Sequence, residues 1–241
     1  MGHRLRTVLV AVTTAGLVAG WVLLNYDSPR GRPPDVIEGV GTFKFSAHQP
    51  GQPDRPVAYD PCRSIEVVVN ESDAPTGGAE LLRSAFEEVA DATGLEFELN
   101  GNTQERVVVD LATGLGTGLG GPPFAPVLVD WTTTENVPGL KGEVAGLAGS
   151  TAVGTRAGGR RYVTGTVALD APDLTLVLER ENGEQEVRAI IMHELGHLVG
   201  LDHVDDAAEL MYDDNVGKPE FGPGDRAGLA KLGEGRCFPG L

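Results

Sequence analysis

Cysteine, histidine and basic side chains are all scarce in this chain of 241 residues. It has two cysteines, five histidines and 19 Lys and Arg against 35 Asp and Glu, which gives a formal net charge of −16 at pH 7. This acidic balance argues against nucleic-acid binding, because a nucleic-acid-binding surface needs a basic stripe. It also argues against adhesion to anionic lipid head groups. High solubility is the simplest consequence of the charge.

The small number of histidines limits where a metal ion can be held. His3 and His48 are isolated, and the other three lie within residues 193–203. Structural zinc sites are built from His and Cys side chains. The composition therefore excludes a second, histidine-rich zinc site.

The two cysteines, Cys62 and Cys237, lie near the two ends of the region that we expect to fold. In an oxidising compartment an even pair favours one disulfide. Such a bond would close a loop of about 175 residues, for which the chain-entropy model gives at most about 5 kcal/mol. The alternative is a thiolate that binds a metal ion and keeps a precursor inactive. We predict the Cys62–Cys237 disulfide.

One segment carries most of the chemical information in the sequence. It reads H-E-x-x-H-x-x-G-x-x-H, with every fixed position filled, from His193 to His203. His193 and His197 are four residues apart and share one face of a helix. Gly200 can adopt a positive φ, which lets the chain leave the helix and turn back so that His203 becomes a third ligand. Three protein nitrogens leave one position open for water, which is typical of catalytic zinc.

Two further residues complete the pattern. Glu194 follows the first histidine and is placed to act on the water as a general base. Met211 lies eight positions after the third histidine, within Leu210-Met211-Tyr212. Together with the histidine motif, this placement resembles the metzincins, and within them the matrixin-like zinc metalloproteases. The resemblance implies that His193, His197 and His203 bind one zinc ion. It also implies that Glu194 is the catalytic base and Met211 the residue of the Met-turn.

The chain departs from the matrixin pattern beside the motif. Val204 follows the third histidine where matrixins tend to have Ser, and Asp213 stands where they tend to have Pro. Both differences affect the wall of the specificity pocket. Tyr212 directly follows Met211, whereas astacin-like enzymes place a zinc-reaching Tyr two residues after the Met. We therefore do not assign Tyr212 to the metal.

Five aspartates surround the third histidine and the Met211 region: Asp202, Asp205, Asp206, Asp213 and Asp214. A solvated acidic loop is the simplest interpretation. The alternatives are support for a metal-binding histidine or a calcium site built from oxygen ligands. Because their spacing does not match an EF-hand loop, calcium remains a weak second cofactor beside zinc.

The N-terminus predicts export. Residues 7–24 are uncharged and just long enough to span a bilayer, and Arg4 and Arg6 precede them. We favour a single-pass anchor with residues 1–6 in the cytoplasm and the catalytic domain outside. A cleaved signal peptide, and hence a secreted protein, is the alternative. Residues 25–61 are rich in Pro and Gly and predict a linker, in which residues 41–46 alternate like a short strand.

The remaining residues, 62–241, predict one zinc metalloprotease catalytic domain of the α+β class. We expect a twisted mixed sheet, an active-site helix and a C-terminal helix. The hydrophobic patterns place strands at 64–70, 95–99, 106–111, 127–131, 142–148 and 162–169, and helices at 78–93, 184–199 and 223–232. The glycine-rich stretch 114–121 contains a G-x-G-x-x-G spacing, but Pro122 and Pro123 follow it. It therefore predicts a surface loop and no dinucleotide site.

These observations predict a zinc-dependent endopeptidase that hydrolyses protein or peptide substrates outside the membrane. The leading alternative is an anchored extracellular binding protein whose zinc site is not catalytic. Hydrolysis of a non-peptide amide is a third interpretation, which the motif alone leaves open.

Overall fold

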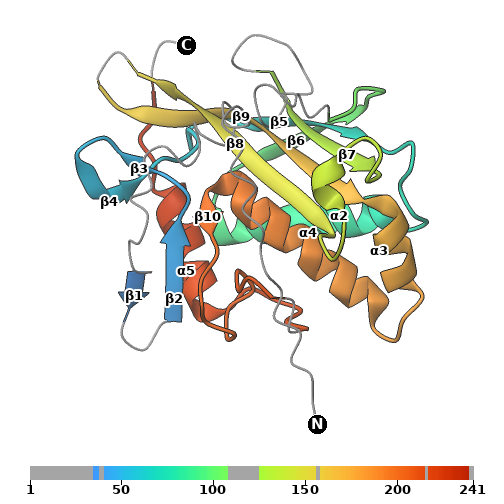
Figure 1. Cartoon of the computed structure of the whole chain (residues 1–241). Coiled ribbons are helices and arrows are strands. Elements are labelled where there is room, and N and C mark those ends of the chain that lie inside the picture. The colour runs from blue at the N-terminus through green and yellow to red at the C-terminus, as the bar shows by residue number, and fades with distance from the viewer. Residues whose placement is uncertain (1–34, 38–40, 108–124, 156–157, 215–216, 239–241) are drawn as a thin grey trace.

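The fold is organised around a mixed sheet of five strands in the order β6-β5-β7-β9-β8 (Figure 1). The computed structural model describes residues 35–37, 41–107, 125–155, 158–214 and 217–238. The strands are β5 (Ile65–Asn70), β6 (Phe97–Asn102), β7 (Val127–Thr132), β8 (Gly146–Gly154) and β9 (Arg160–Asp170). Neighbours from β6 to β9 run parallel, and β8 pairs antiparallel with β9 at the edge.

The central strand β7 explains why the sheet is covered on both faces. All six of its residues are buried, with no hydrophobic–polar alternation, as expected for a parallel strand enclosed by other elements. Val127 and Val129 belong to the main core. Leu128, on the opposite face, packs in a smaller cluster with Val137 and Leu140, beside the short 3-10 helix η1 (Pro138–Leu140).

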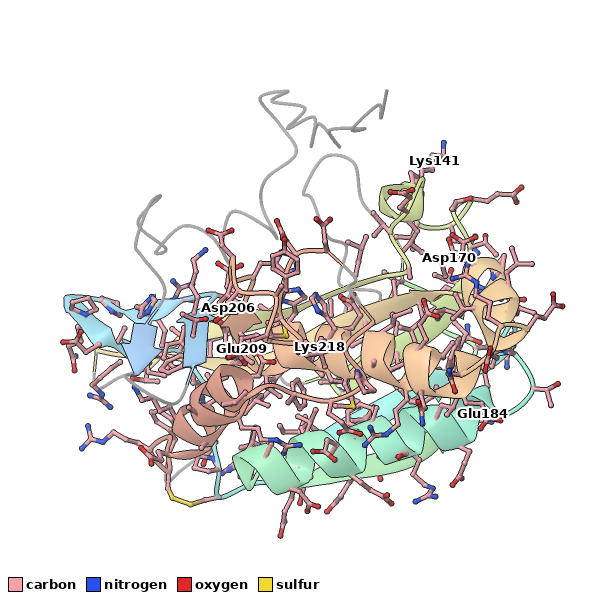
Figure 2. All side chains as sticks on the ribbon, turned by 90° about the horizontal axis from the view of Figure 1, so that it is seen from below. Lys141, Asp170, Glu184, Asp206, Glu209 and Lys218 are labelled. Carbon is pink, nitrogen blue, oxygen red and sulfur yellow. A yellow bond between two sulfur atoms is a disulfide. The ribbon has the colours of Figure 1, made fainter. Side chains whose placement is uncertain are left out.

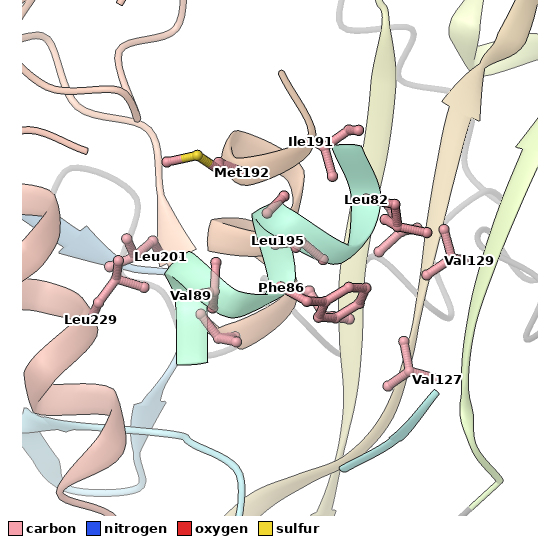
Figure 3. Packing of buried hydrophobic residues seen from close by; sticks show 14 of the residues in the cluster. Leu82, Phe86, Val89, Val127, Val129, Ile191, Met192, Leu195, Leu201 and Leu229 are labelled. Atoms are coloured by element: carbon pink, nitrogen blue, oxygen red, sulfur yellow. The ribbon is translucent and has the colours of Figure 1, made fainter. Parts of the chain in front are cut away.

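Two long helices pack on the main-core face of the sheet, α2 (Gly78–Thr93) and α4 (Gly183–Val199) (Figure 1). Figure 3 shows Leu82 and Phe86 of α2 directed toward β7, with Leu195 of α4 nearby. The two shorter helices are α3 (Ala171–Leu178) and α5 (Pro223–Gly233). The α+β class predicted from the sequence is therefore confirmed for the described residues.

The smaller strands lie at one end of the molecule. They are β1 (Asp35–Ile37), β2 (Gly41–Phe45), β3 (His48–Gln49), β4 (Gln52–Pro56) and β10 (Leu201–Asp202). β2 lies between β1 and β10 in a three-stranded antiparallel sheet. Phe43 and Phe45 are buried in the main core, so part of the Pro/Gly-rich stretch is packed against the rest of the fold. The domain limits themselves stay a prediction.

Several predicted elements need correction. The strand expected at 142–148 begins only at Gly146, because Gly142 has a positive φ of 98° and residues 141–143 form a turn. The strand expected at 95–99 is shifted to Phe97–Asn102. At 106–111, Arg106 and Val107 are not in a strand, and the other residues lie outside the described part. The sequence analysis missed α3, whose signal is Asp170, which caps the helix by accepting the Asp173 N–H at 3.2 Å.

The predicted membrane segment at 7–24 and the glycine-rich loop at 114–121 both lie outside the described residues. Among the residues that are described, no helix combines the length and the apolar character needed to cross a bilayer.

The two cysteines form the predicted disulfide. Cys62 and Cys237 are bonded, with their Cα atoms 5.4 Å apart and a sequence separation of 175 residues. The bond joins the segment before β5 to the segment after α5, and Figure 2 shows it in yellow. The alternative of a metal-binding thiolate is wrong, because both sulfur atoms are used in this bond.

Removing the disulfide should lower the free energy of unfolding. A Cys62→Ser/Cys237→Ser variant is expected to lose stability, with about 5 kcal/mol as the upper limit from chain entropy. Urea unfolding of this variant and of the parent, each with and without reductant, measures the loss. Reductant should destabilise the parent and leave the variant unchanged. Equal stability of the oxidised parent and the variant would contradict the prediction.

Candidate metal centre

The first two predicted ligands lie one turn apart on α4. His193 and His197 have ring centroids 4.8 Å apart. The Nδ1 of His193 donates to the Leu210 carbonyl at 2.8 Å, and the Nδ1 of His197 donates to the Leu201 carbonyl at 2.9 Å. Each bond places the ring proton on Nδ1, so both Nε2 atoms present a lone pair to a metal ion.

Gly200 provides the reversal that the sequence predicted. It ends α4 with φ 124°, and its N–H donates to the Gly196 carbonyl at 3.1 Å. A Cβ there would lie 3.1 Å from side-chain atoms of both Leu232 and Tyr162, in addition to the unfavourable φ. The chain then runs back through β10 and brings His203 over the helix.

The three imidazoles converge on a common point. The Nε2 of His203 lies 3.0 Å from Nε2 of His193 and 3.0 Å from Nε2 of His197. Zinc–nitrogen bonds of 2.0–2.1 Å in a tetrahedral site correspond to nitrogen separations of about 3.3 Å. The three nitrogens therefore suit one zinc ion with little adjustment.

The local electrostatics also favour a metal. Burial, aided by the neighbouring His203, lowers the pKa of His193 to about 4. Burial also lowers the pKa of His197, and partial loss of contact with water in the cleft lowers the pKa of His203. The imidazoles are thus neutral near pH 7, which is the form that binds metal.

Met211 lies directly under α4. Its side chain is buried, and a Cβ at Gly196 would lie 2.6 Å from its Sδ. Gly196, between the two helical ligands, therefore permits the thioether to pack against the helix backbone. The Met211 carbonyl accepts the N–H of Val204 at 3.0 Å. The residue after the third ligand is thus bonded to the predicted Met-turn.

Two buried carboxylates hold this turn against α5. Asp225 accepts hydrogen bonds from the backbone N–H groups of Leu210 and Met211. In return, Glu209 accepts the N–H groups of Gly224 at 3.0 Å and Asp225 at 2.9 Å, at the N-terminus of α5. Neither carboxylate belongs to a recognisable sequence motif, because a buried acid that accepts backbone N–H groups of a distant segment has no fixed spacing from them.

Glu194 lines the same cleft as the histidines. It is 7% exposed, and burial raises its pKa to about 8 in the absence of a metal ion. A Cβ at Gly146, the first residue of β8, would lie 2.6 Å from its Cγ. A glycine at this position therefore makes room for the Glu194 side chain, and the sequence analysis did not single it out.

Hydrogen bonds join the edge strand β8 to α4 beside the predicted ligands. The Ser150 hydroxyl donates to the Leu198 carbonyl at 2.7 Å, and the Tyr59 hydroxyl donates to Ser150 at 2.5 Å. Residues of β8 and of α4 both line a cleft of about 1230 Å³. Tyr212 also lines this cleft.

The five aspartates near the third histidine do not gather into a cation site. Asp202 pairs with Lys44, and Asp206 accepts a hydrogen bond from Thr42. Among the described residues, the only other cluster of potential metal ligands is Asp60 with Cys62 and Cys237. Because these two cysteines are bonded to each other, that cluster offers no thiolate. Nothing in the described part of the chain supports the calcium site.

Comparison with known proteins supports the resemblance drawn from the motif. A family model described as Matrixin matches residues 131–231. This range contains the three histidines, Glu194 and Met211, so the resemblance to the matrixin-like metzincins is confirmed over this part of the chain. The match supports a zinc metallopeptidase.

Among solved structures, the chain is similar to archaemetzincin from Methanopyrus kandleri, with 15% sequence identity and a TM-score of 0.43. The alignment covers 71% of this chain and 97% of that protein. No curated protein sequence matches the chain.

The raised pKa of Glu194 makes a pH-dependent prediction for the metal-free protein. Between about pH 4.5 and pH 8 the folded protein holds a proton that the unfolded chain has released, so the stability of the parent falls as pH rises through this range. A Glu194→Gln variant lacks this effect. It should be more stable than the parent near pH 8, by several kcal/mol, since one pKa unit corresponds to about 1.4 kcal/mol.

Urea unfolding in the presence of a chelator, from pH 4.5 to pH 8, measures the difference. The difference in free energy of unfolding between the parent and Glu194→Gln should disappear toward pH 4.5. A difference that stays the same at every pH would contradict the assignment of a buried, protonated Glu194.

Proposed function

We propose that the chain is a zinc-dependent endopeptidase that hydrolyses peptide bonds of protein or peptide substrates. The observation that carries the proposal is the convergence of three Nε2 atoms, 3.0 Å apart in two of their three pairs, in an open cleft that also contains Glu194. Within the described residues, the ligand group contains His193, His197 and His203 and no fourth protein ligand. This donor set supports a catalytic zinc with an open position.

The roles of the residues follow from their places. His193, His197 and His203 would hold the ion, which when bound supplies a Lewis acid for the substrate carbonyl and lowers the pKa of water. Glu194 takes the proton of the water that attacks the peptide carbonyl, and it passes that proton to the leaving amine. The charge of a nearby divalent cation favours the ionised carboxylate. It would therefore offset the burial that raises the pKa of Glu194.

The edge strand supports an extended substrate. Among the described strands, β8 pairs only with β9, and its other edge borders the cleft. A peptide laid along this edge would gain main-chain hydrogen bonds from β8 and bring one carbonyl over the histidines. The cleft therefore suits cleavage within a chain.

We further propose that the protein acts outside the membrane, either anchored by residues 7–24 or secreted after their removal. The Cys62–Cys237 disulfide supports export, because such bonds persist in oxidising compartments. An anchored binding protein with a non-catalytic zinc site is the alternative. The buried Glu194 in the cleft favours the enzyme.

Loss of the carboxylate should separate metal binding from catalysis. A Glu194→Ala variant is expected to bind zinc like the parent and to lose at least about 100-fold in kcat/KM, because general-base catalysis contributes about 100- to 10,000-fold. Zinc content by metal analysis and cleavage of a peptide library read by mass spectrometry measure the two properties.

Glu184→Ala, at an exposed position in the first turn of the same helix, is the matched control and should cleave like the parent. Cleavage by the parent should stop on addition of a chelator and return with zinc. A Glu194→Ala protein that cleaves as fast as the parent would refute the mechanism. A zinc-loaded parent that cleaves nothing in the library would favour the binding protein.

The charge of the cleft predicts a substrate preference. Its lining includes the exposed carboxylates of Glu143, Glu181, Asp213 and Asp214, while Lys218 is the only Lys or Arg among its described lining residues. Peptides with Lys or Arg near the scissile bond should therefore have a higher kcat/KM than the same peptides with Gln. The ratio of kcat/KM for the Lys or Arg peptide to kcat/KM for the Gln peptide should fall as the salt concentration rises, because salt screens exposed charges.

Asp213→Asn/Asp214→Asn should reduce this ratio, whereas Glu98→Gln should leave it unchanged. Glu98 is also exposed, but it lies on β6 at the opposite edge of the sheet. A ratio that is insensitive to salt and to the double substitution would contradict the expected preference and leave the peptidase proposal intact.

A further inference from the structure

β2 lies upstream of both the predicted catalytic domain and residues 131–231, yet it touches the loop of the third ligand. It pairs antiparallel with β10, with Leu201 opposite Phe45 and Asp202 opposite Lys44. His203 follows β10 directly. The Ser46 N–H donates to the Gly200 carbonyl at 2.9 Å. The strand is therefore bonded to the chain reversal between α4 and the third ligand.

The side chains of this strand divide between two roles. Phe43 and Phe45 are buried in the main core. The alternate residues reach the loop instead, and the Thr42 hydroxyl donates to Asp206 at 2.7 Å. Figure 2 shows Asp206 beside β2. The buried rings of Phe43 and Phe45 fix the position of β2. The polar side chains of the strand are therefore held at a fixed position relative to the loop that carries His203.

Lys44 is connected to the third ligand through one carboxylate. Its Nζ lies 2.6 Å from Oδ2 of Asp202, and both side chains are 30% exposed. The other oxygen of this carboxylate, Oδ1, accepts the backbone N–H of His203 at 2.9 Å. The ion pair thus fixes the carboxylate, and the carboxylate fixes the backbone of His203.

His203 depends on such support more than the other two ligands. His193 and His197 lie on a helix, and their Nδ1 atoms are bonded to backbone carbonyls. His203 lies on a loop and is exposed. A ligand on a loop loses more conformational freedom on metal binding unless the backbone is already held.

We propose that β2 is part of the metal centre and that Lys44 is a positioning residue, which holds His203 in place for the metal ion through Asp202. The inference rests on the proposed zinc site but not on peptidase activity. It assigns a role in metal binding to a strand that lies more than 140 residues before the histidine motif.

The test is the zinc affinity of the full chain, measured by competition with a chromogenic chelator. Lys44→Met should raise the zinc Kd roughly 10-fold, the lower end of the range for residues that support metal ligands. Lys44→Arg keeps the charge and should bind nearly as tightly as the parent. Lys141→Met, at an exposed position on the turn before β8, is the control and should leave the Kd unchanged.

A second substitution tests the same link from its other end. Asp202→Asn keeps an oxygen for the His203 N–H but loses the ion pair, so it should weaken zinc binding to a similar extent. When Asp202→Asn is combined with Lys44→Met, the zinc affinity should fall little further, because both substitutions remove the same ion pair. With Co²⁺ in place of zinc, both variants should also alter the visible absorption of the bound ion.

Unfolding of the metal-free proteins separates positioning from general stability. Lys44→Met should unfold at nearly the same urea concentration as Lys141→Met. An unchanged zinc Kd in Lys44→Met, or an equal loss in Lys44→Arg, would overturn the inference. A loss of zinc affinity in Lys44→Met that is matched by an equal loss of stability of the metal-free protein would also overturn the inference. Failure of the parent itself to bind zinc would instead refute the proposed site.

Discussion

The candidate metal centre depends on the chain reversing direction at the end of α4. Two of the predicted ligands come from the helix and the third from the segment after it, so a chain that continued as helix would carry His203 away from the other two. Gly200 makes the reversal with a φ of 124°, a conformation that is unfavourable for residues other than glycine. A Cβ at that position would also lie 3.1 Å from side-chain atoms of Leu232 and Tyr162, so these neighbours would have to shift.

The reversal is useful only because the returning loop is held on several sides. The backbone of Val204 is bonded to Met211, whose thioether packs on Gly196 under the helix. Asp225 and Glu209 bind this turn to α5 through backbone N–H groups. Both carboxylates are buried, which would be costly without these donors. Burial still raises the pKa of Asp225 to about 6, so the donors offset only part of that cost.

The sequence predicted those features of the site that local geometry controls. The spacing of His193 and His197 requires only a helix, and Gly200 requires only a residue that tolerates positive φ. The helix over 78–93 has the predicted bounds, because its apolar stripe lies between two glycines with positive φ, Gly77 at the N-cap and Gly94 at the C-cap. The strand bounds were less accurate at β8, because the start of an edge strand depends on its partner β9 and on the turn at Gly142.

By itself, the sequence predicted the three histidine ligands, the neighbouring base Glu194, the Met-turn and the pairing of the two cysteines. The predictions for the metal centre follow from residue type and short spacing, whereas the disulfide follows from the presence of only two cysteines. Only the tertiary structure decided that Gly146 makes room for Glu194, that Asp225 and Glu209 hold the turn, and that Lys44 meets Asp202. These contacts join residues from different elements, which the backbone brings together only when the sheet and helices pack. Neither the spacing nor the periodicity of the chain contains that information.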